Sequence, residues 1–237
     1  AVAPDAPIYP KKPLITGAAS FAGAGFAFLF IAIRALRDRK IGTMNQVKSF
    51  EAIAGFPVVA ALPLQREGVL PDNVSMDSDY ARILLDLATM LSIGSGGMGS
   101  IVVTPLQEGD GGTSVAVSLA LMCRGVGLKT LLVELNADHA VTQLFGGVGH
   151  LGLVDCARQG IDPESAIWVA DGHGLQILSY GIDASALDYQ SMAAIEQAFD
   201  RLRTRYDVLI LDAPPLSSTK HACRLAQRAD QMLVVTL

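Results

Sequence analysis

A glycine-rich loop at residues 104–114 (TPLQEGDGGTS) is the first feature of the chain that could do chemistry. It follows an apolar run at 101–103 and opens a helical pattern at 114–123. Glycines allow successive backbone N–H groups to converge on phosphate oxygens, and the dipole of a following helix adds positive potential. Asp212, which ends the apolar run 208–211, suits a magnesium-bound water. These features indicate phosphate chemistry.

Short apolar runs and helical patterns alternate in the part of the chain that must position these residues. The runs are bounded by Gly, Pro or charge, and each is too short for a helix. They lie at 101–103, 130–133, 175–178, 208–211 and 232–235. The helical patterns lie at 80–92, where Asp79 can cap the first turn, and at 114–123, 163–169, 191–205 and 220–229.

This alternation predicts an α/β fold. Strands that are apolar on both faces are typical of a parallel sheet covered by helices on each side. Ligands of such sheets bind at the carboxyl ends of the strands. We therefore expect a doubly wound, mostly parallel sheet in one domain at residues 79–237, which follows a juxtamembrane linker at 35–78.

A run of twenty residues without a charge, 14–33, precedes this domain. A helix of that length is about 30 Å long, the thickness of the hydrocarbon core of a bilayer. A buried core helix would normally show a polar face, and only Thr16 and Ser20 interrupt the apolar surface. The pattern predicts one transmembrane helix at 14–34, preceded by a proline-rich lead-in at 1–13.

Charge sets the expected orientation of the span. Four cationic residues follow it and two precede it, so the carboxyl side should face the cytoplasm and the lead-in the periplasm. These residues are Arg34, Arg37, Arg39 and Lys40 after the span and Lys11 and Lys12 before it. Residues 1–50 carry a net charge of +5 and residues 51–237 a net charge of −10. An acidic body behind a basic segment disfavours nucleic acid as a partner.

The glycine-rich loop also carries a specific resemblance. Residues 101–120 resemble the phosphate loop of the bacterial tyrosine kinases through Val103-Thr104-Pro105, Gly109-Asp110-Gly111-Gly112-Thr113-Ser114 and Ser118-Leu119-Ala120. Further matches are Lys11-Lys12-Pro13, Phe56-Pro57-Val58-Val59, Asp79-Tyr80-Ala81-Arg82 and the segment Tyr206 to Pro215 (YDVLILDAPP). The chain is therefore similar to the carboxyl-terminal part of the polysaccharide co-polymerases, which control chain length and export of surface polysaccharides. The resemblance implies a sheet of the P-loop NTPase type.

Two loops depart from the pattern of this family. Gly112 stands where the family has the lysine that reaches the β- and γ-phosphates. The segment Glu134-Leu135-Asn136 stands where the family has Asp-x-Asp, whereas Asp212 is retained. A charge-assisted contact of the kind that the lysine makes is worth about 1.5 to 3 kcal/mol. We therefore expect phosphoryl transfer to be lost.

The resemblance assigns roles to the remaining site residues. ATP and Mg²⁺ are the implied cofactors, although the altered loops are also compatible with binding neither. Thr113 and Asp212 would hold the magnesium ion, and Asp212 and Glu134 would be the catalytic carboxylates of an active protein. The cradle for the phosphates would consist of Gly109, Asp110, Gly111, Gly112, Thr113 and Ser114. A structural interpretation stays open, with the glycines in a tight turn, Thr113 as a helix cap and Asp212 as a turn former.

These observations predict an inner-membrane protein of exopolysaccharide, capsule or lipopolysaccharide biosynthesis and export. Its cytoplasmic kinase-like domain would be catalytically inactive and act as a scaffold. Asp79 and Arg82 match the helix that the family uses in ring assembly, so they are the expected oligomerisation residues of a homo-oligomer. The expected partners are the inner membrane and a polysaccharide polymerase or outer-membrane exporter. The chain stops at an apolar run, and we expect its carboxyl-terminal tail to be missing.

Two other functions remain as alternatives. An active tyrosine autokinase would need a cation donated by a neighbouring subunit, for which Lys129, Lys220 and Arg224 are candidates. Against it, the sequence holds five tyrosines and no terminal cluster of them. A partition or septum-positioning ATPase is disfavoured because Gln107 occupies the place of the signature lysine of that class.

Overall fold

The computed structural model describes residues 57–63, 78–94, 99–182, 189–216 and 228–237. Apart from the last residue, they belong to one compact unit, Phe56–Thr236. The predicted lead-in at 1–13, the predicted span at 14–34 and most of the linker at 35–78 lie outside the described residues. Within the part that is described, no helix is both long enough and apolar enough to cross a membrane.

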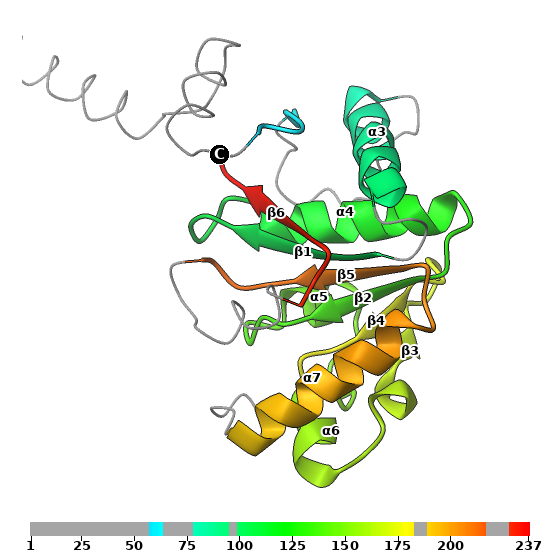
Figure 1. Ribbon diagram of the computed structural model, residues 1–237, viewed down its shortest axis with the longest axis vertical. Helices are drawn as coiled ribbons and strands as arrows, with labels where there is room; N and C mark the ends of the chain where they lie inside the picture. Colours follow the sequence, from blue (N-terminus) through cyan, green and yellow to red (C-terminus); the bar gives the residue numbers. More distant parts are fainter. Residues whose placement is uncertain (1–56, 64–77, 95–98, 183–188, 217–227) are drawn as a thin grey trace, which may run out of the picture. The chain divides into compact units, whose positions relative to one another are not determined.

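Six strands form one sheet in the order β3-β4-β2-β5-β1-β6 (Figure 1). Their bounds are β1 Gly99–Pro105, β2 Thr130–Glu134, β3 Trp168–Val169, β4 Gln176–Leu178, β5 Val208–Asp212 and β6 Gln231–Val235. Neighbouring strands are parallel except β3 and β4, which are antiparallel. The predicted α/β class is confirmed as a mixed sheet, whose parallel part holds the strands that lead into the candidate loops.

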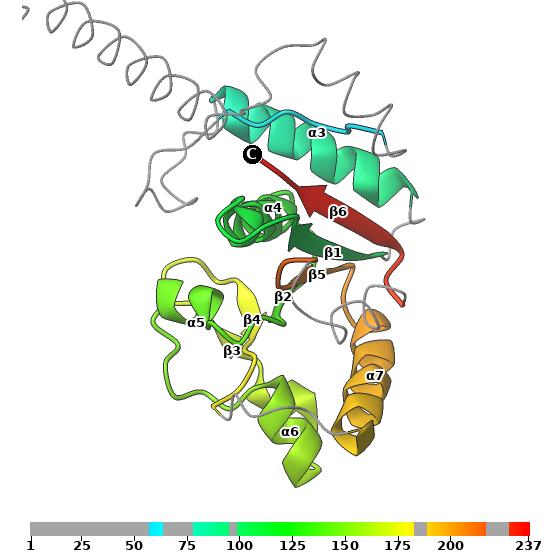
Figure 2. The same cartoon turned by 90° about the vertical axis from the view of Figure 1, so that its left-hand side faces the viewer.

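Helices cover both faces of the sheet. Their bounds are α3 Asp79–Gly94, α4 Gly112–Gly125, α5 Ala140–Leu144, α6 Leu153–Gln159 and α7 Tyr189–Arg203, with a short 3₁₀ helix, η2, at Pro163–Ala166. Helix α4 packs on β1, β2 and β5, whereas α7 packs on β5 and α6 from the opposite face (Figures 1 and 2). The outline predicted from the alternation therefore holds.

One predicted helix, at residues 163–169, is wrong in its second half. Asp162 caps the 3₁₀ helix by accepting a hydrogen bond from the backbone N–H of Glu164, and the backbone then becomes extended at Ile167. Trp168 pairs with Ile177 of β4, so tertiary pairing overrides the helical pattern. The predicted helix at 220–229 lies mostly outside the described residues.

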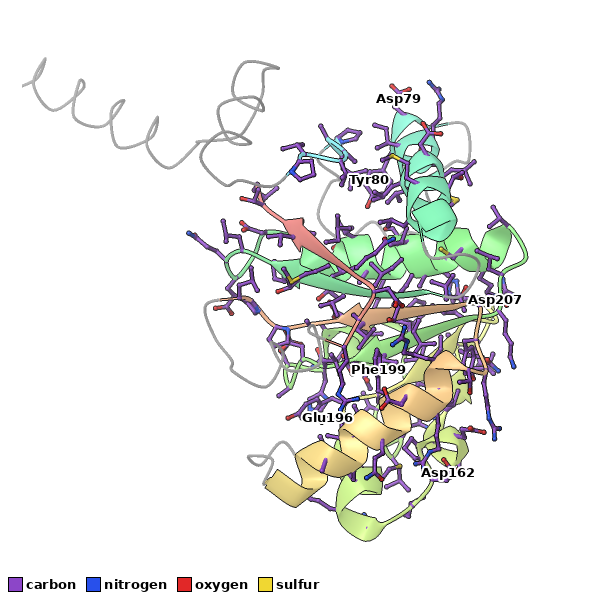
Figure 3. All side chains as sticks on the ribbon, in the orientation of Figure 1. Asp79, Tyr80, Asp162, Glu196, Phe199 and Asp207 are labelled. Carbon is purple, nitrogen blue, oxygen red and sulfur yellow. The ribbon has the colours of Figure 1, made fainter. Side chains whose placement is uncertain are left out.

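The core consists of two apolar layers separated by the sheet. Alternate residues of β5 point to opposite faces: Ile210 packs on the α4 side and Leu211 on the α6–α7 side, and both are fully buried. Strands that are buried on both faces explain why these segments read as continuous apolar runs. Helix α3 forms a further layer on α4, where the hydroxyls of Tyr80 and Ser118 are 3.1 Å apart (Figure 3).

The register of the parallel strands brings the candidate loops to one edge. Val103 of β1 and Glu134 of β2 both pair with Asp212 of β5. The chain leaves β1, β2 and β5 at their carboxyl ends, where ligands of open α/β sheets bind. The sheet therefore places the three loops singled out from the sequence side by side.

Candidate functional site

The glycine-rich loop connects β1 to α4 in a conformation that few residues other than glycine adopt. Gly109 and Gly111 have φ angles of 90° and 83°, in the left-handed region. Gly111 is the N-cap of α4, and no side chain caps the helix there. The loop is held instead by Asp110, whose carboxylate accepts a 2.9 Å hydrogen bond from the backbone N–H of Gln107. Because the first N–H groups of a helix have no partner within it, this uncapped terminus can bind an anion.

Gly112, the position of the missing lysine, is in close contact with Pro105 at the end of β1. A Cβ atom at Gly112 would lie 2.6 Å from Cδ of Pro105 and 3.0 Å from both its Cγ and its backbone nitrogen. Such distances are shorter than van der Waals contact, and a proline ring cannot swing away as a long side chain can. The two residues therefore exclude any side chain at the position from which the family's lysine extends.

The retained carboxylate, Asp212, lies beside the first turn of α4. Its Oδ2 accepts a 3.0 Å hydrogen bond from the hydroxyl of Thr113, and the side chain is fully buried. Its Oδ1 has no hydrogen-bond partner among the described residues. A buried carboxylate oxygen without a donor, next to a threonine hydroxyl, has the donor set that suits Mg²⁺. The structure thus brings together the two residues predicted to hold the metal.

Burial raises the pKa of Asp212 to about 7. The hydrogen bond from Thr113 lowers this pKa, while the nearby carboxylates of Glu134 and Asp138 raise it further. Removal of a carboxylate from water disfavours its charged form, which explains the direction of the shift. The described residues therefore bring several carboxylates close together at this edge, a setting that a divalent ion would stabilise.

Glu134 ends β2 next to Asp212 but turns its carboxylate away into the protein. Oε1 accepts hydrogen bonds from the backbone N–H groups of Val141 (2.7 Å) and Thr142 (3.2 Å) at the start of α5. Oε2 accepts hydrogen bonds from the Thr142 hydroxyl and, at 3.4 Å, from the backbone N–H of Tyr180. Both oxygens are thus occupied by groups that fix α5 and the end of β4. The predicted catalytic role of Glu134 is untested, and its observed contacts are those of a helix cap.

Two residues that sequence reasoning missed extend this network. The Thr142 hydroxyl lies 2.9 Å from Oγ of Ser179, which in turn accepts a 3.0 Å hydrogen bond from the indole N–H of Trp168. Hydrogen-bond contacts thus link Trp168, Ser179, Thr142 and Glu134 in one continuous chain. No spacing in the sequence marks it, since its members come from four separate elements that meet only in the fold. Pro105 was likewise missed, because only the fold shows its contact with Gly112.

The predicted oligomerisation residues lie on the surface of α3. Asp79 and Arg82 form an i,i+3 ion pair at 3.2 Å, and most of each side chain is exposed. They are thus accessible to another molecule, while their role in assembly stays a prediction.

Lys129 is the one cation suggested as a substitute for the lysine that lies among the described residues, and it lies away from the glycine-rich loop of its own chain. The backbone N–H of Lys129 donates a 2.8 Å hydrogen bond to Asp207, and its ammonium lies 4.9 Å from the centre of the Tyr206 ring. These residues precede β2 and β5, at the amino ends of the strands and opposite the glycine-rich loop (Figure 3). Lys220 and Arg224 lie outside the described residues.

Several known proteins are similar in sequence to this chain. EpsB of Ralstonia nicotianae, a candidate tyrosine-protein kinase, is 23% identical over 257 residues, which cover 100% of this chain and 33% of EpsB. The tyrosine-protein kinase CpsD of Streptococcus agalactiae is 24% identical over 139 residues, which cover 57% of this chain and 60% of CpsD. The chain thus spans about a third of the length of its EpsB relatives. No protein-family model matches it.

Solved structures with the same fold include the kinase domain of the Escherichia coli tyrosine kinase ETK. It has a TM-score of 0.68 and 15% identity, and the match covers 82% of this chain and 81% of that domain. The tyrosine kinase domain of BceF has a TM-score of 0.64 and 19% identity, with 79% of this chain and 84% of that domain covered. A cobyrinic acid a,c-diamide synthase from Mycobacterium smegmatis, solved with ADP and magnesium, matches at a TM-score of 0.51 and 20% identity, with 58% of each chain covered.

The chain thus has a mixed α/β sheet whose fold is similar to that of these P-loop NTPase-like neighbours. Within that class, the relatives and the fold confirm the resemblance seen at the glycine-rich loop. The chain is related to the bacterial tyrosine kinases and corresponds to their carboxyl-terminal kinase part, with altered phosphate-binding residues.

Proposed function

We propose that this chain supplies the kinase-like cytoplasmic domain of an inner-membrane protein for exopolysaccharide, capsule or lipopolysaccharide biosynthesis and export. The domain has lost phosphoryl transfer and acts as a scaffold that couples a membrane homo-oligomer to a polysaccharide polymerase or outer-membrane exporter. The names of the relatives support the kinase-like part of this proposal, and the uncharged run at 14–33 supports the membrane part. The exposed pair Asp79 and Arg82 supports assembly through α3.

The contact between Pro105 and Gly112 is the observation that carries the loss of catalysis. Phosphoryl transfer depends on electrostatic stabilisation of the transferred group, and the loop lysine is one of its main sources. The loop here lacks the lysine and also lacks room for any side chain at Gly112. Glu134 is engaged with α5, so it does not compensate on the carboxylate side.

Nucleotide binding without transfer is compatible with the same residues. The uncapped N–H groups at the start of α4 would hold phosphate oxygens, and Thr113 with Asp212 would hold Mg²⁺. When bound, the metal ion would supply positive charge between the phosphates and the buried carboxylate of Asp212. The chain's own contribution is to position the phosphates with its backbone and to keep water from Asp212.

Autophosphorylation of the purified full chain with Mg-ATP tests the proposal. The expected result is no phosphotyrosine above that of Asp212→Asn, because neither protein can stabilise the transferred group. The kinase domain of the Escherichia coli tyrosine kinase ETK, assayed under the same conditions, serves as the positive control. Phosphotyrosine that accumulates on the unmodified chain and disappears in Asp212→Asn would overturn the loss of catalysis.

An active tyrosine autokinase is the second candidate. The pair of Thr113 and Asp212, with Oδ1 of the carboxylate lacking a hydrogen-bond partner among the described residues, favours it because a metal ion held there would assist phosphoryl transfer. The missing cation would then come from a neighbouring copy. Phosphotyrosine would in that case form at a rate that rises with protein concentration, which the scaffold proposal does not allow.

A further inference from the structure

The polar groups around the glycine-rich loop favour two phosphates over three. In loops of this type the backbone N–H groups cradle the α- and β-phosphates, whereas the lysine reaches the β- and γ-phosphates. Here the first set of contacts is available, since the left-handed Gly111 leaves the start of α4 uncapped. The second set is absent, since Pro105 closes the space beside Gly112.

The charges of the segments at the carboxyl ends of the strands also favour two phosphates over three. The described parts of the segments that follow β1, β2 and β5 (residues 104–114, 134–140 and 212–216) contain no Lys or Arg. They contain five carboxylates: Glu108, Asp110, Glu134, Asp138 and Asp212. An additional phosphate placed beyond the backbone cradle would therefore approach the carboxylates of these described segments, which offer it no Lys or Arg side chain.

A second observation shows that this edge is built for a ligand. Oδ1 of Asp212 is buried and accepts no hydrogen bond from any described residue, while Oδ2 is held by Thr113 of the first turn of α4. A buried acceptor without a donor is costly and is retained where a cation or a donor completes it. The uncapped helix terminus and this oxygen together fit a metal-bound anion.

We infer that the site selects a nucleoside diphosphate with Mg²⁺ over the corresponding triphosphate, and so reports the diphosphate rather than consuming the triphosphate. This inference rests on the nucleotide site proposed above. The backbone of the loop holds the two inner phosphates, Thr113 and Asp212 hold the metal ion, and the described residues offer no cationic side chain for a third phosphate. No bond is made or broken in this role.

Calorimetric titration of the full chain, purified in detergent, with ADP and with the β,γ-imido analogue of ATP tests the inference. In the presence of Mg²⁺, ADP should bind at least about tenfold more tightly than the analogue, the factor that corresponds to one lost charge-assisted contact. Thr113→Val should weaken both ligands to a similar degree, because it removes the hydroxyl next to the metal. If Thr113→Val changes neither affinity, the ligands bind elsewhere and the inference is overturned.

The double variant Pro105→Ser/Gly112→Lys tests the cause of the preference. Its folding is checked by circular dichroism, and the gap between ADP and the analogue should then close to within about twofold, because the lysine supplies the missing contact. An unchanged gap in the folded double variant would contradict the assignment of the preference to the missing cation.

Two results separate this inference from the proposed function. Equal or tighter binding of the triphosphate analogue, or no binding of either ligand, overturns the diphosphate preference but leaves a scaffold without catalysis standing. Phosphotyrosine formation in the autophosphorylation assay overturns the scaffold proposal, whatever the ratio of the two affinities.

Discussion

Pro105 and Gly112 lie on consecutive elements and occupy the space that a single lysine would need. A side chain at 112 would meet the proline ring, and a smaller residue at 105 would leave a gap beside the glycine. Pro105 and Gly112 together therefore exclude a lysine at position 112. Restoring the cation requires both positions to change.

The contact between Pro105 and Gly112 predicts the stability of single and double variants. Gly112→Lys should lower the free energy of unfolding by about 1 to 3 kcal/mol, the usual cost of overpacking. Pro105→Ser/Gly112→Lys should recover most of this loss. The matched control is Gly125→Lys at the other end of α4, where a Cβ atom meets nothing within 4 Å. Urea unfolding measures all three, and a Gly112→Lys variant as stable as Gly125→Lys would contradict the steric argument.

Asp212 predicts a pH dependence of stability. Its pKa in the folded protein is about 7, above the ordinary value of 3.8. The folded state therefore keeps a proton that the unfolded state has already lost, and stability falls as the pH rises from about 4 to about 7. Asp212→Asn removes this loss, so without metal it should be the more stable protein above pH 7, by on the order of 3 kcal/mol.

Urea unfolding across this pH range, with a chelator present, checks the prediction. The two proteins should converge in relative stability below about pH 4, where Asp212 is protonated in both states. Asp86→Asn, an exposed change on α3, is the control: it keeps Asp212, so its pH profile should run parallel to that of the parent chain. Parallel pH profiles for Asp212→Asn and the parent chain would show that Asp212 is not held protonated by burial.

At the scale of elements, Glu134 ties β2 to α5 and to the end of β4. Helix α5, Ala140–Leu144, is too short to be stable from local contacts, and its first N–H groups depend on the Glu134 carboxylate. The additional methylene of glutamate, relative to the aspartate expected from the family, lets the carboxylate extend to this helix. The Glu134 carboxylate therefore stabilises α5 and does not face the candidate site.

Substitutions at Glu134 should loosen α5. Glu134→Asp restores the family residue and shortens the side chain. Hydrogen exchange at the amides of Val141 and Thr142 should then become faster by about tenfold or more. The reason is that each hydrogen bond to a charged group is worth about 1.5 to 3 kcal/mol. Glu134→Gln should act in the same direction. Glu164→Gln, on the 3₁₀ helix η2, is the control. Unchanged exchange in Glu134→Asp would mean that α5 does not depend on this cap.

At the scale of the whole molecule, an acidic α/β domain follows a basic, apolar amino-terminal segment. The net charge of +5 over residues 1–50 and −10 over residues 51–237 separates the two parts chemically. The uncharged run at 14–33 is long enough for a bilayer, and the cations behind it favour a cytoplasmic domain. The domain would thus be held at a membrane surface together with its copies.

Fractionation of bacterial cells that express the full chain tests this arrangement. The chain should stay in the membrane pellet after an alkaline carbonate wash, because such a wash removes proteins held only by charge. The variant Phe26→Lys/Phe28→Lys, which places two charges in the run, should be released to a large extent. Release of the unmodified chain into the supernatant would contradict the predicted span.

Most of the fold could be predicted from local patterns, whereas parts of the site could not. The apolar runs at 130–133 and 208–211 correspond to β2 and β5, and the loop before α4 lies where the glycines indicated. The helix expected at 163–169 failed because the pairing of Trp168 with Ile177 outweighs helical periodicity. The contacts of Glu134 were not foreseeable, since a carboxylate at the end of a strand can turn toward the site or away from it.

By itself, the sequence determined which residues of the family pattern are replaced and which class of fold carries them. Residue type and spacing are local properties, so the missing lysine, the altered Asp-x-Asp and the alternation of strands and helices are readable without coordinates. Only the tertiary structure decided that Pro105 closes on Gly112, that Glu134 caps α5 and that Asp212 is shielded from water. Each of these depends on burial and on distant segments brought together by the sheet, and neither is encoded in spacing along the chain.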